Sequence, residues 1–485
     1  MKNKILTVIL SIGLAITMTL ASLSALAVSN LSVGDVNADG AITIDDVTYL
    51  AQYVAGWDVE LGVNNSNSSG NNSNSGNVST VFSNDIYSSL PNKNEVHVLM
   101  WRNYSPLEQQ VIDAYTALTG VKIKTTITTD AEYNTKLVSL ISNQTPPDVV
   151  VFKSTTFLSI AAKSLKPLDK TIFKLDDPCW NKNSMDAMKI NGNYFGVAMP
   201  WSINCDDQSY VTYYNPSVLR ECGITTMPYQ LYTEGKWNWD TQAKIIAKVK
   251  NAGKGYTGLS IQSTDAFMHS AGEDFVSYNG SQFTSNINSV QESSNLVKAW
   301  QEMAKLNASS SFTCWDTNLF NQGKVGLFTA NAYGLRKDSG WFDNTRGGYA
   351  NLQAVPVAGP KNQTAYTPTR NKLWGTAKHA PNPEGAAYFL RYFLDGTNYN
   401  QSDVFCNTQF STVFDLISSK TAKKSVMYGQ GVTDYIKADN YSYITNKIVA
   451  ATPANVANII DANKNAILNS LDRVNKQLAQ ISTIN

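Results

Sequence analysis

Hydrophobic positions from residue 95 onward alternate between short apolar runs and stretches in which apolar residues recur every three or four positions. Short apolar runs are typical of buried strands, and the longer spacing is typical of amphipathic helices. The pattern predicts strands over Glu95–Trp101, Lys122–Thr128 and Val149–Phe152, and helices over Pro106–Thr119 and Ala131–Gln144. Gly120 is placed to end the first helix. Strands that alternate with helices imply parallel pairing and an α/β fold.

The loops after the first and third predicted strands are candidates for ligand binding. In open parallel sheets, ligands lie beyond the carboxyl ends of the strands. The two loops begin with Trp101-Arg102-Asn103 and Lys153-Ser154-Thr155. Position alone therefore nominates Trp101, Arg102, Asn103 and Ser154.

The N-terminal 27 residues have the pattern of a secretion signal. Two lysines precede an apolar stretch, and Ala25-Leu26-Ala27 is a small-x-small cleavage site. The alternative is an uncleaved anchor, because the apolar stretch is nearly long enough to span a bilayer. We expect residues 1–27 to be removed and the mature protein to be secreted, either extracellular or associated with the cell surface.

Residues 64–77 consist entirely of Asn, Ser and Gly. Such a segment buries no apolar area, so it predicts a flexible linker over about 64–80. The linker separates a small module, residues 28–63, from a large one, residues 90–485.

The small module contains a calcium loop by sequence pattern. Oxygen-bearing side chains occupy loop positions 1, 3 and 5, a glycine stands at the sharp turn, and a carboxylate closes the loop at position 12. The predicted Ca²⁺ ligands are Asp35, Asn37, Asp39, Ala41 through its carbonyl, Thr43 and Asp46. The alternative is an acidic turn without metal. Apolar residues at helical spacing follow the loop, so the module is predicted to be helical.

The stretch GDVNADGAITIDDVTYLAQYVAG resembles one repeat of a type I dockerin. Dockerins attach secreted proteins to cohesin-bearing scaffold proteins, and they normally carry two such repeats. Only one repeat is present here. The resemblance therefore implies either a cohesin-bearing partner or a calcium-stabilised N-terminal cap.

Six stretches of the large module occur in the order found in one known family. They are EVHVLMW with LEQQVIDAYTALTGVKI, KLVSLISNQTPPDVVVF, INGNYFGVAMPW, VTYYNPSVLRECGI, FNQGKVGLFTANAYGLR and LWGTAKHAPNPEGAAYFLRYFL. Together they resemble the extracellular solute-binding proteins of ABC importers, of the sugar-binding kind related to maltose-binding protein. An amphipathic C-terminal helix from about Ile467 to Ile481 agrees with the resemblance.

The resemblance implies a two-lobed, periplasmic-binding-protein-like (type II) α/β fold in which hinge crossovers join the lobes and a sugar occupies the cleft. Lobe one is expected over about 93–202 and 325–373, and lobe two over about 203–324 and 374–485. The hinge crossings are then expected near Trp201-Ser202, Gly323-Lys324 and Trp374-Gly375. The expected partners are an oligosaccharide and an ABC permease, and no reaction is implied.

Aromatic and polar residues near strand ends and crossings are the candidate sugar ligands, because aromatic rings match the apolar faces of sugars and planar polar groups match their hydroxyls. Besides the strand-end residues, the candidates are Trp201, Asp206, Asp207, Tyr333, Trp341 and Trp374. Core packing is the alternative for each Trp. Arg102 has the alternative of an ion pair with a surface carboxylate. The two Asp residues have the alternative of being solvated hinge acids. Trp180, Trp237, Trp239 and Trp300 are expected to pack.

Composition narrows the classes of function. The 39 basic and 38 acidic residues nearly cancel, and no basic run favours nucleic acid. Charged residues make up only 16% of the chain, and aromatic residues 11%. Motifs such as GxSxG, HExxH and the P-loop are absent from the sequence. The remaining alternatives to a binding protein are a scaffold-associated glycoside hydrolase, which needs two carboxylates across a cleft, and an adhesive polysaccharide-binding component.

Overall fold

A computed structural model of the protein describes residues 95–287, 294–419, 421–428 and 440–481. The chain divides into two units, residues 1–77 and 78–485, and every described residue belongs to the second. The expected signal peptide (1–27), calcium repeat (28–63) and linker (64–80) lie outside the described residues.

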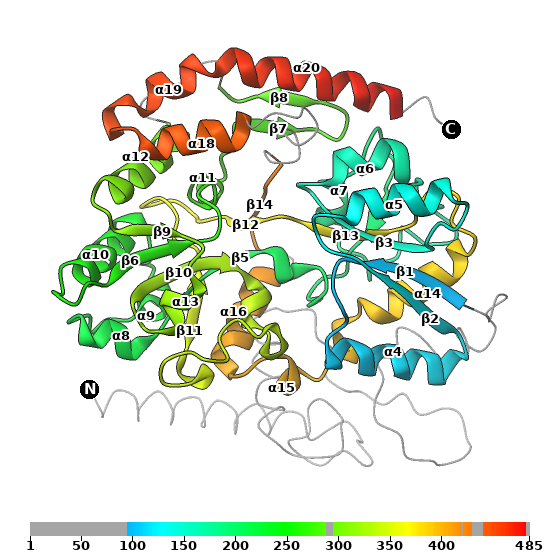
Figure 1. Cartoon of the computed structure of the whole chain (residues 1–485), viewed down its shortest axis with the longest axis horizontal. Helices are drawn as coiled ribbons and strands as arrows, with labels where there is room; N and C mark the ends of the chain where they lie inside the picture. The colour runs from blue at the N-terminus through cyan, green and yellow to red at the C-terminus, as the bar shows by residue number, and fades with distance from the viewer. Residues whose placement is uncertain (1–94, 288–293, 420, 429–439, 482–485) are drawn as a thin grey trace, which may run out of the picture. The chain divides into compact units, whose positions relative to one another are not determined.

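The first five-stranded sheet has the strand order β2-β1-β3-β13-β4 (Figure 1). Its strands are β1 (Glu95–Met100), β2 (Lys122–Ile127), β3 (Val149–Lys153), β13 (Lys372–Gly375) and β4 (Gly196–Val197). β1 pairs in parallel with both β2 and β3, whereas β13 runs antiparallel to β3. Helices α4 (Pro106–Thr119) and α14 (Pro383–Phe393) pack on each other, and α5 (Tyr133–Ser142) packs on α6 (Phe157–Ser164).

The predicted opening of the large module is confirmed. All three strands and both helices form, with ends within two residues of the predicted ones. Ser105 and Glu108 make a capping box at the start of α4, and Gly120 ends the helix in the left-handed conformation at φ 73°. Local sequence signals therefore determine this region.

The second five-stranded sheet has the order β11-β5-β10-β6-β9. Its strands are β5 (Tyr210–Tyr214), β6 (Thr257–Ile261), β9 (Phe312–Cys314), β10 (Val325–Asn331) and β11 (Gln353–Pro356). β10 is parallel to β6 and antiparallel to β5, and β6 is parallel to β9. The carboxyl ends of β6, β9 and β10 therefore lie at one edge, together with the start of β5.

Helices and short 3-10 turns complete the described part of the chain. The helices are α7 (Lys182–Asp186), α8 (Pro216–Glu221), α9 (Pro228–Thr233), α10 (Trp239–Lys250), α11 (Ala266–Ser270), α12 (Asn295–Ala308), α13 (Thr317–Asn321), α15 (Gln401–Val404), α16 (Thr408–Ser418), α18 (Asn440–Ala450), α19 (Val456–Ala462) and α20 (Lys464–Ile481). The 3-10 turns are η1 (Asp206–Gln208), η2 (Ala332–Leu335), η3 (Lys337–Ser339), η4 (Tyr349–Asn351), η5 (Gly396–Asn398) and η6 (Pro453–Asn455). α20 is the expected C-terminal helix. It packs on α6 and on β8 (Phe283–Ser285), which forms a hairpin with β7 (Val276–Tyr278).

Three segments carry the chain between the two sheets: residues 198–209, 357–371 and 394–407. The second contains β12 (Thr367–Thr369), which pairs in parallel with β14 (Lys424–Val426). We call residues 198–209 and 357–371 together with β14 the hinge. The first crossing includes Trp201 and Ser202, where a crossing was expected.

The expected lobe boundaries after residue 324 are wrong. β10 and β11 lie in the second sheet, so residues 325–356 do not return to lobe one. Conversely, β13 lies in the first sheet and α14 contacts β1, so residues 374–393 belong to lobe one. β10 is buried along its whole length, and an apolar run of this kind fits either sheet, so its sequence does not reveal which one receives it.

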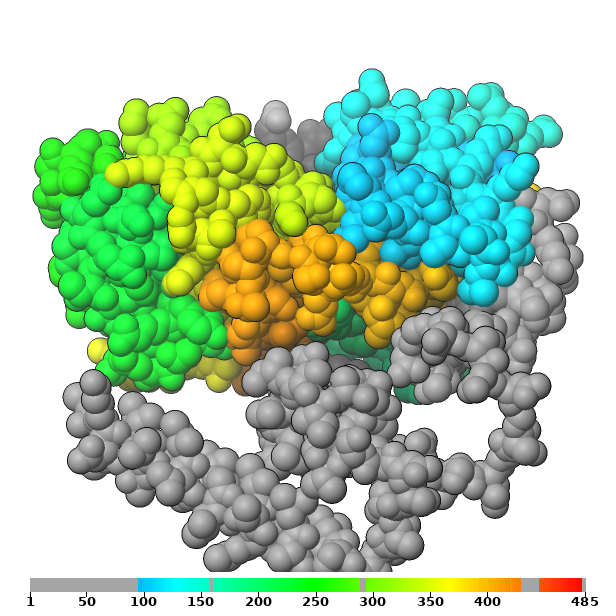
Figure 2. Space-filling view, turned by 90° about the horizontal axis from the view of Figure 1, so that it is seen from below, coloured from blue at the N-terminus to red at the C-terminus, as the bar shows by residue number. Residues whose placement is uncertain are grey.

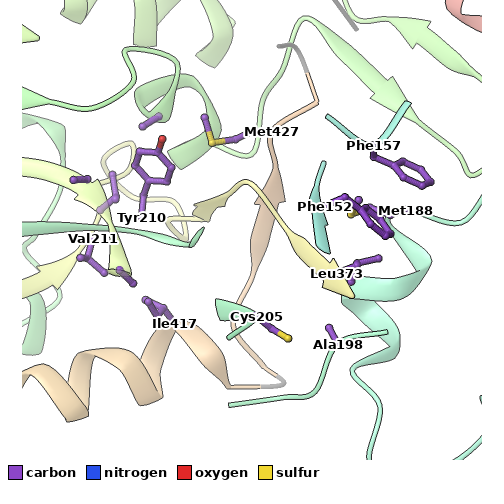
Figure 3. Close-up of a cluster of buried hydrophobic side chains, with 14 of the residues drawn as sticks. Phe152, Phe157, Met188, Ala198, Cys205, Tyr210, Val211, Leu373, Ile417 and Met427 are labelled. Carbon is purple, nitrogen blue, oxygen red and sulfur yellow. The ribbon is translucent and has the colours of Figure 1, made fainter. Parts of the chain in front are cut away.

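Buried apolar side chains pack against both sheets, and the same core cluster continues across the hinge (Figure 3). Phe152, Phe157, Met188 and Leu373 gather on the side of the first sheet, and Tyr210 and Val211 stand on β5. Met427 lies between these groups, directly after β14. Among the described helices, none is long and apolar enough to cross a membrane.

Candidate functional site

Trp101 lies at the carboxyl edge of the first sheet, directly after β1, and its ring is partly exposed. The edge of the ring meets Tyr133 at 5.5 Å between centroids. Lys153 Nζ, at the end of β3, lies 4.4 Å from the Trp101 ring centroid and 3.0 Å from Asp130 Oδ1. A cation held over one face of an indole fixes its orientation and leaves the rest of the ring available.

Three further aromatic rings lie at the carboxyl edge of the second sheet. Trp315 follows β9 and is 42% exposed, an unusual state for so large an apolar side chain. Its ring meets Trp341 at 5.0 Å, and Trp341 meets Tyr333 at 5.6 Å, both edge to face. Tyr333 and Trp341 are each partly exposed. We call Trp101, Tyr333, Trp341 and Trp315 the aromatic row.

The two edges come together at Tyr333. The Arg102 guanidinium, next to Trp101, lies 5.6 Å from the Tyr333 ring centroid, and the Arg336 guanidinium lies 5.3 Å from it. Figure 2 shows the blue residues of the β1–α4 region meeting the yellow-green residues around η2. The aromatic row therefore runs along both edges.

The Arg102 guanidinium is paired with a carboxylate, so its two terminal nitrogens are not free to bind sugar hydroxyls. Its two terminal nitrogens donate to Glu108 Oε1 and Oε2 at 2.7 Å each. Arg336, fully buried, lies 3.4 Å from Glu108 Oε1 and 2.7 Å from Asp338 Oδ2. Burial alone would raise the pKa of Glu108, but the two guanidinium groups and the Ser105 backbone N–H outweigh it and lower the pKa to about 2. The ion-pair interpretation of Arg102 is correct, although its partner is buried.

The expected hydroxyl acceptors Asp206 and Asp207 are buried and bonded within the hinge. Asp206 Oδ1 lies 2.5 Å from Lys424 Nζ, and Asp207 Oδ2 lies 2.6 Å from Lys372 Nζ. The carboxylates are 4% and 2% exposed. Both carboxylates therefore join the first crossing to neighbouring strands. The prediction of solvated hinge acids is wrong, because each carboxylate is buried and pairs with a lysine and not with water.

Ser154 and Asn103 have different fates. Ser154 is buried, and its hydroxyl donates to the Met427 carbonyl at 2.8 Å, so it ties β3 to the hinge. Asn103 is exposed, and its carbonyl accepts from Arg102. Of these two residues, only Asn103 remains reachable from solvent.

Trp374 packs inside the protein, and Trp201 packs against the core while it stays partly exposed. Trp374 is 1% exposed, donates from Nε1 to the Asn204 carbonyl at 3.0 Å and packs on Phe393. Trp201 donates to Asp415 and meets the Phe414 ring edge to face at 5.8 Å. The expected cleft position of Trp374 is therefore wrong, because strand β13 turns its side chain into the core.

The packing prediction for the other tryptophans is confirmed: Trp180, Trp237, Trp239 and Trp300 are all buried. Trp315 is the residue that sequence reasoning missed. Its signal is positional, because it directly follows the short strand FTC just as Trp101 follows β1. Among the described residues, no group of three or more metal-ligating side chains is placed to hold an ion.

Comparisons with known proteins support this architecture. Residues 102–395, more than half of the chain, match the family model described as bacterial extracellular solute-binding protein. A search of curated proteins found no significant match.

Solved structures with the same fold include three binding proteins. The cyclic alpha-maltosyl-1,6-maltose binding protein from Arthrobacter globiformis is 16% identical, with a TM-score of 0.57 over 79% of this chain and 98% of that one. The galacto-N-biose-/lacto-N-biose I-binding protein of the ABC transporter from Bifidobacterium longum is 14% identical, with a TM-score of 0.57 over 78% of this chain and 97% of that one. The ABC transporter associated binding protein from B. animalis subsp. lactis Bl-04, in complex with beta-1,6-galactobiose, is 14% identical, with a TM-score of 0.58 over 79% and 98%.

The family match covers β3, β5, β6, β9, β10, β11 and β13, and with them the strand ends that carry Tyr333, Trp341 and Trp315. The described part of the chain has the two α/β sheets joined by crossings that were expected from the sequence, apart from the misplaced lobe boundaries. The chain therefore belongs to the bacterial extracellular solute-binding protein family.

Proposed function

We propose that this protein captures an oligosaccharide along the aromatic row and passes it to an ABC importer or retains it at the cell surface. The observation that carries the proposal is the aromatic row itself, above all the half-exposed Trp315. Aromatic faces at ligand sites bury the apolar face of a sugar ring. The sugar-binding proteins among the solved structures with this fold make the same ligand class the first to test.

Titration of tryptophan fluorescence against neutral oligosaccharides, followed by analysis of the sugars recovered, tests the proposal. We expect a saturable change in emission and recovery of the sugar unchanged. Shorter sugars in the recovered sample would favour the glycoside hydrolase alternative. The absence of any response to sugars would point to another polar solute.

We further propose that the loop Asp35–Asp46 binds Ca²⁺ and that residues 28–63 attach the protein to a surface or scaffold. The support is the sequence register of the six oxygen ligands. A pull-down with a cohesin domain, with and without a calcium chelator, tests the scaffold partner. Binding that is absent in both conditions would leave the module as a calcium-stabilised cap.

A further inference from the structure

Three polar side chains gather at the start of β5, the end of β10 and the turn before β13, and the one on β10 stands two residues before Tyr333 of the aromatic row. Tyr210 and Asn331 stand opposite each other in the β5–β10 ladder. The Arg370 guanidinium lies 5.7 Å from the Tyr210 ring centroid. Figure 3 shows the Tyr210 ring beside Met427 of the neighbouring hinge segment, with Val211 directed to the other side of β5. We call Tyr210, Asn331 and Arg370 the polar cluster.

The polar cluster has unused hydrogen-bonding groups. Asn331 Oδ1 and Arg370 Nε are buried atoms that make no hydrogen bond within the described part of the chain. The Tyr210 hydroxyl is buried as well and has no partner at full hydrogen-bond geometry, although the Ser263 hydroxyl lies near it. Tyr210 is 0% exposed and Asn331 5%. Buried polar groups without partners are costly, so three of them side by side require an explanation such as a ligand.

Arg370 differs from the other arginines whose side chains are mostly buried. Arg102, Arg336 and Arg391 each pair with a carboxylate, at 2.7 Å, 2.7 Å and 3.0 Å. Arg370 is half-buried and has no ion pair among the described residues. A guanidinium with five donors and no acceptor is a receptor for oxygen atoms supplied from outside.

The mixture of donors and acceptors defines the class of ligand. Arg370 only donates, whereas Asn331 has an Oδ1 acceptor that makes no hydrogen bond among the described residues and an amide group that can also donate. Burial raises the pKa of Tyr210 to about 12 although the Arg370 charge lowers it, so the hydroxyl stays neutral and both donates and accepts. Hydroxyl groups match such a set, because each both donates and accepts. A carboxylate only accepts and matches it less well.

We propose that the polar cluster binds two neighbouring hydroxyls of a neutral sugar ring whose face lies on the aromatic row. This inference rests on the proposed function and adds the residues that select the sugar. Tyr210 and Asn331 are enclosed, and Arg370, the half-exposed member, lies over the Tyr210 ring. Binding therefore displaces the Arg370 side chain. Because Arg370 lies between β12 and β13, this displacement connects hydroxyl binding to the hinge.

The test uses the full-length protein and the neutral oligosaccharide that gives the strongest fluorescence response. The variants are Arg370→Met and Tyr210→Phe, and the control is Tyr214→Phe on the same strand, whose hydroxyl donates to Gln353 Oε1 at 2.6 Å. Affinities are measured by calorimetry for the parent sugar, for singly deoxygenated analogues and for the matching uronic acid. Melting temperatures are measured without ligand.

We expect Arg370→Met to weaken binding about ten- to a hundredfold and Tyr210→Phe roughly three- to tenfold. Both variants should discriminate less between the parent sugar and one deoxygenated analogue. Tyr214→Phe should bind normally but melt at a lower temperature, because it loses a made hydrogen bond. Tyr210→Phe should melt at the same or a higher temperature, because it loses an unpaired hydroxyl.

Three results would overturn the inference. If Arg370→Met and Tyr210→Phe both bind the sugar with wild-type affinity, the polar cluster does not contact the sugar. The proposed function of the aromatic row would stand. Tighter binding of the uronic acid than of the neutral sugar would replace the hydroxyl assignment with a carboxylate. Wild-type protein that binds no sugar would refute the proposed function as well as the inference.

Discussion

Hinge residues and three of the four members of the aromatic row, all but Trp315, were nominated by the same argument from position, yet the structure uses the two regions differently. In the hinge, Asp206 and Asp207 are bonded to lysines, and Trp374 is buried in the core. In the aromatic row, Trp315 is 42% exposed and its contacts are with other rings. The buried charges of the hinge join chain segments to each other. The rings of the aromatic row stay partly exposed, as a proposed ligand site requires.

The difference follows from the cost of burial. A charge that leaves water must find a partner, so charged residues at a buried crossing bond to each other. An aromatic ring loses little when it is exposed, and it gains when a ligand covers it. Residue type therefore has to be weighed together with burial before a strand-end residue is assigned to ligand binding.

The largest effect is expected at the buried ion pairs that surround the hinge. Glu108→Gln leaves the Arg102 and Arg336 guanidinium groups without their shared carboxylate. Removal of one member of a buried pair costs about 3–5 kcal/mol of the free energy of unfolding. Urea denaturation at pH 7 measures the loss.

Glu221→Gln is the matched control, because Glu221 pairs with Arg346 at 2.5 Å but both side chains reach solvent, at 30% and 44% exposure. An exposed pair contributes about 0–1 kcal/mol, so this variant should unfold nearly as the wild type does. Equal losses in the two variants would contradict the division between buried and exposed charges.

A buried carboxyl group without a charged partner should have the opposite effect. Asp274 is 7% exposed, and its carboxyl oxygens have no partner at full hydrogen-bond geometry among the described residues, although the backbone N–H groups of Phe275, Val276 and Tyr428 lie near them. His269 Nε2 lies 3.6 Å away. Burial, reinforced by Asp265, raises the pKa of Asp274 from 3.8 to about 8. Burial also lowers the pKa of His269 to about 4, so both groups are neutral at pH 7.

Because the folded-state pKa of Asp274 exceeds its unfolded value, its contribution to stability is complete below pH 3.8 and is lost as the pH rises to about 8. Asp274→Asn should therefore raise the free energy of unfolding at pH 8 by up to about 5 kcal/mol, because a rise in pKa from 3.8 to about 8 corresponds to about 1.4 kcal/mol per unit, and should change little near pH 4. Denaturation across this pH range measures the effect, with the exposed Asp472→Asn as control. A destabilised Asp274→Asn variant at pH 8 would show instead that Asp274 and His269 form an ion pair.

The sequence predicted the local elements better than their assembly. The helical spacing of apolar residues and the stop at Gly120 are local signals, so α4 was predicted to the residue. The membership of β10 depends on pairing with β5 and β6, more than sixty residues away. Trp374 shows the same limit at the site, because the side of β13 that it faces is set by β3 and β4. Position along a strand is local information, and burial is not.

The aromatic row should respond in ligand binding rather than in stability. Trp315→Ala removes a half-exposed face, so we expect an affinity for the bound oligosaccharide about tenfold lower, which corresponds to about 1.4 kcal/mol. The free energy of unfolding should change by less than about 1 kcal/mol. Val138→Ala, on a helix and 46% exposed, is the control and should leave the affinity unchanged. A Trp315→Ala variant that unfolds easily but binds normally would show that Trp315 is a packing residue. The most exposed member of the aromatic row would then behave as the hinge residues do.

The smallest effect is expected from removal of calcium. The predicted ligands lie between residues 35 and 46, and the asparagine-, serine- and glycine-rich segment 64–77 separates them from the hinge and the aromatic row. A flexible linker transmits little free energy between the modules that it joins. Chelation should therefore unfold residues 28–63 and leave the melting temperature and sugar affinity of the large module unchanged, as calorimetry with and without a chelator would show. A shift in either quantity would mean that the calcium module contacts the large module, and both regions would then have to be compared again with calcium bound.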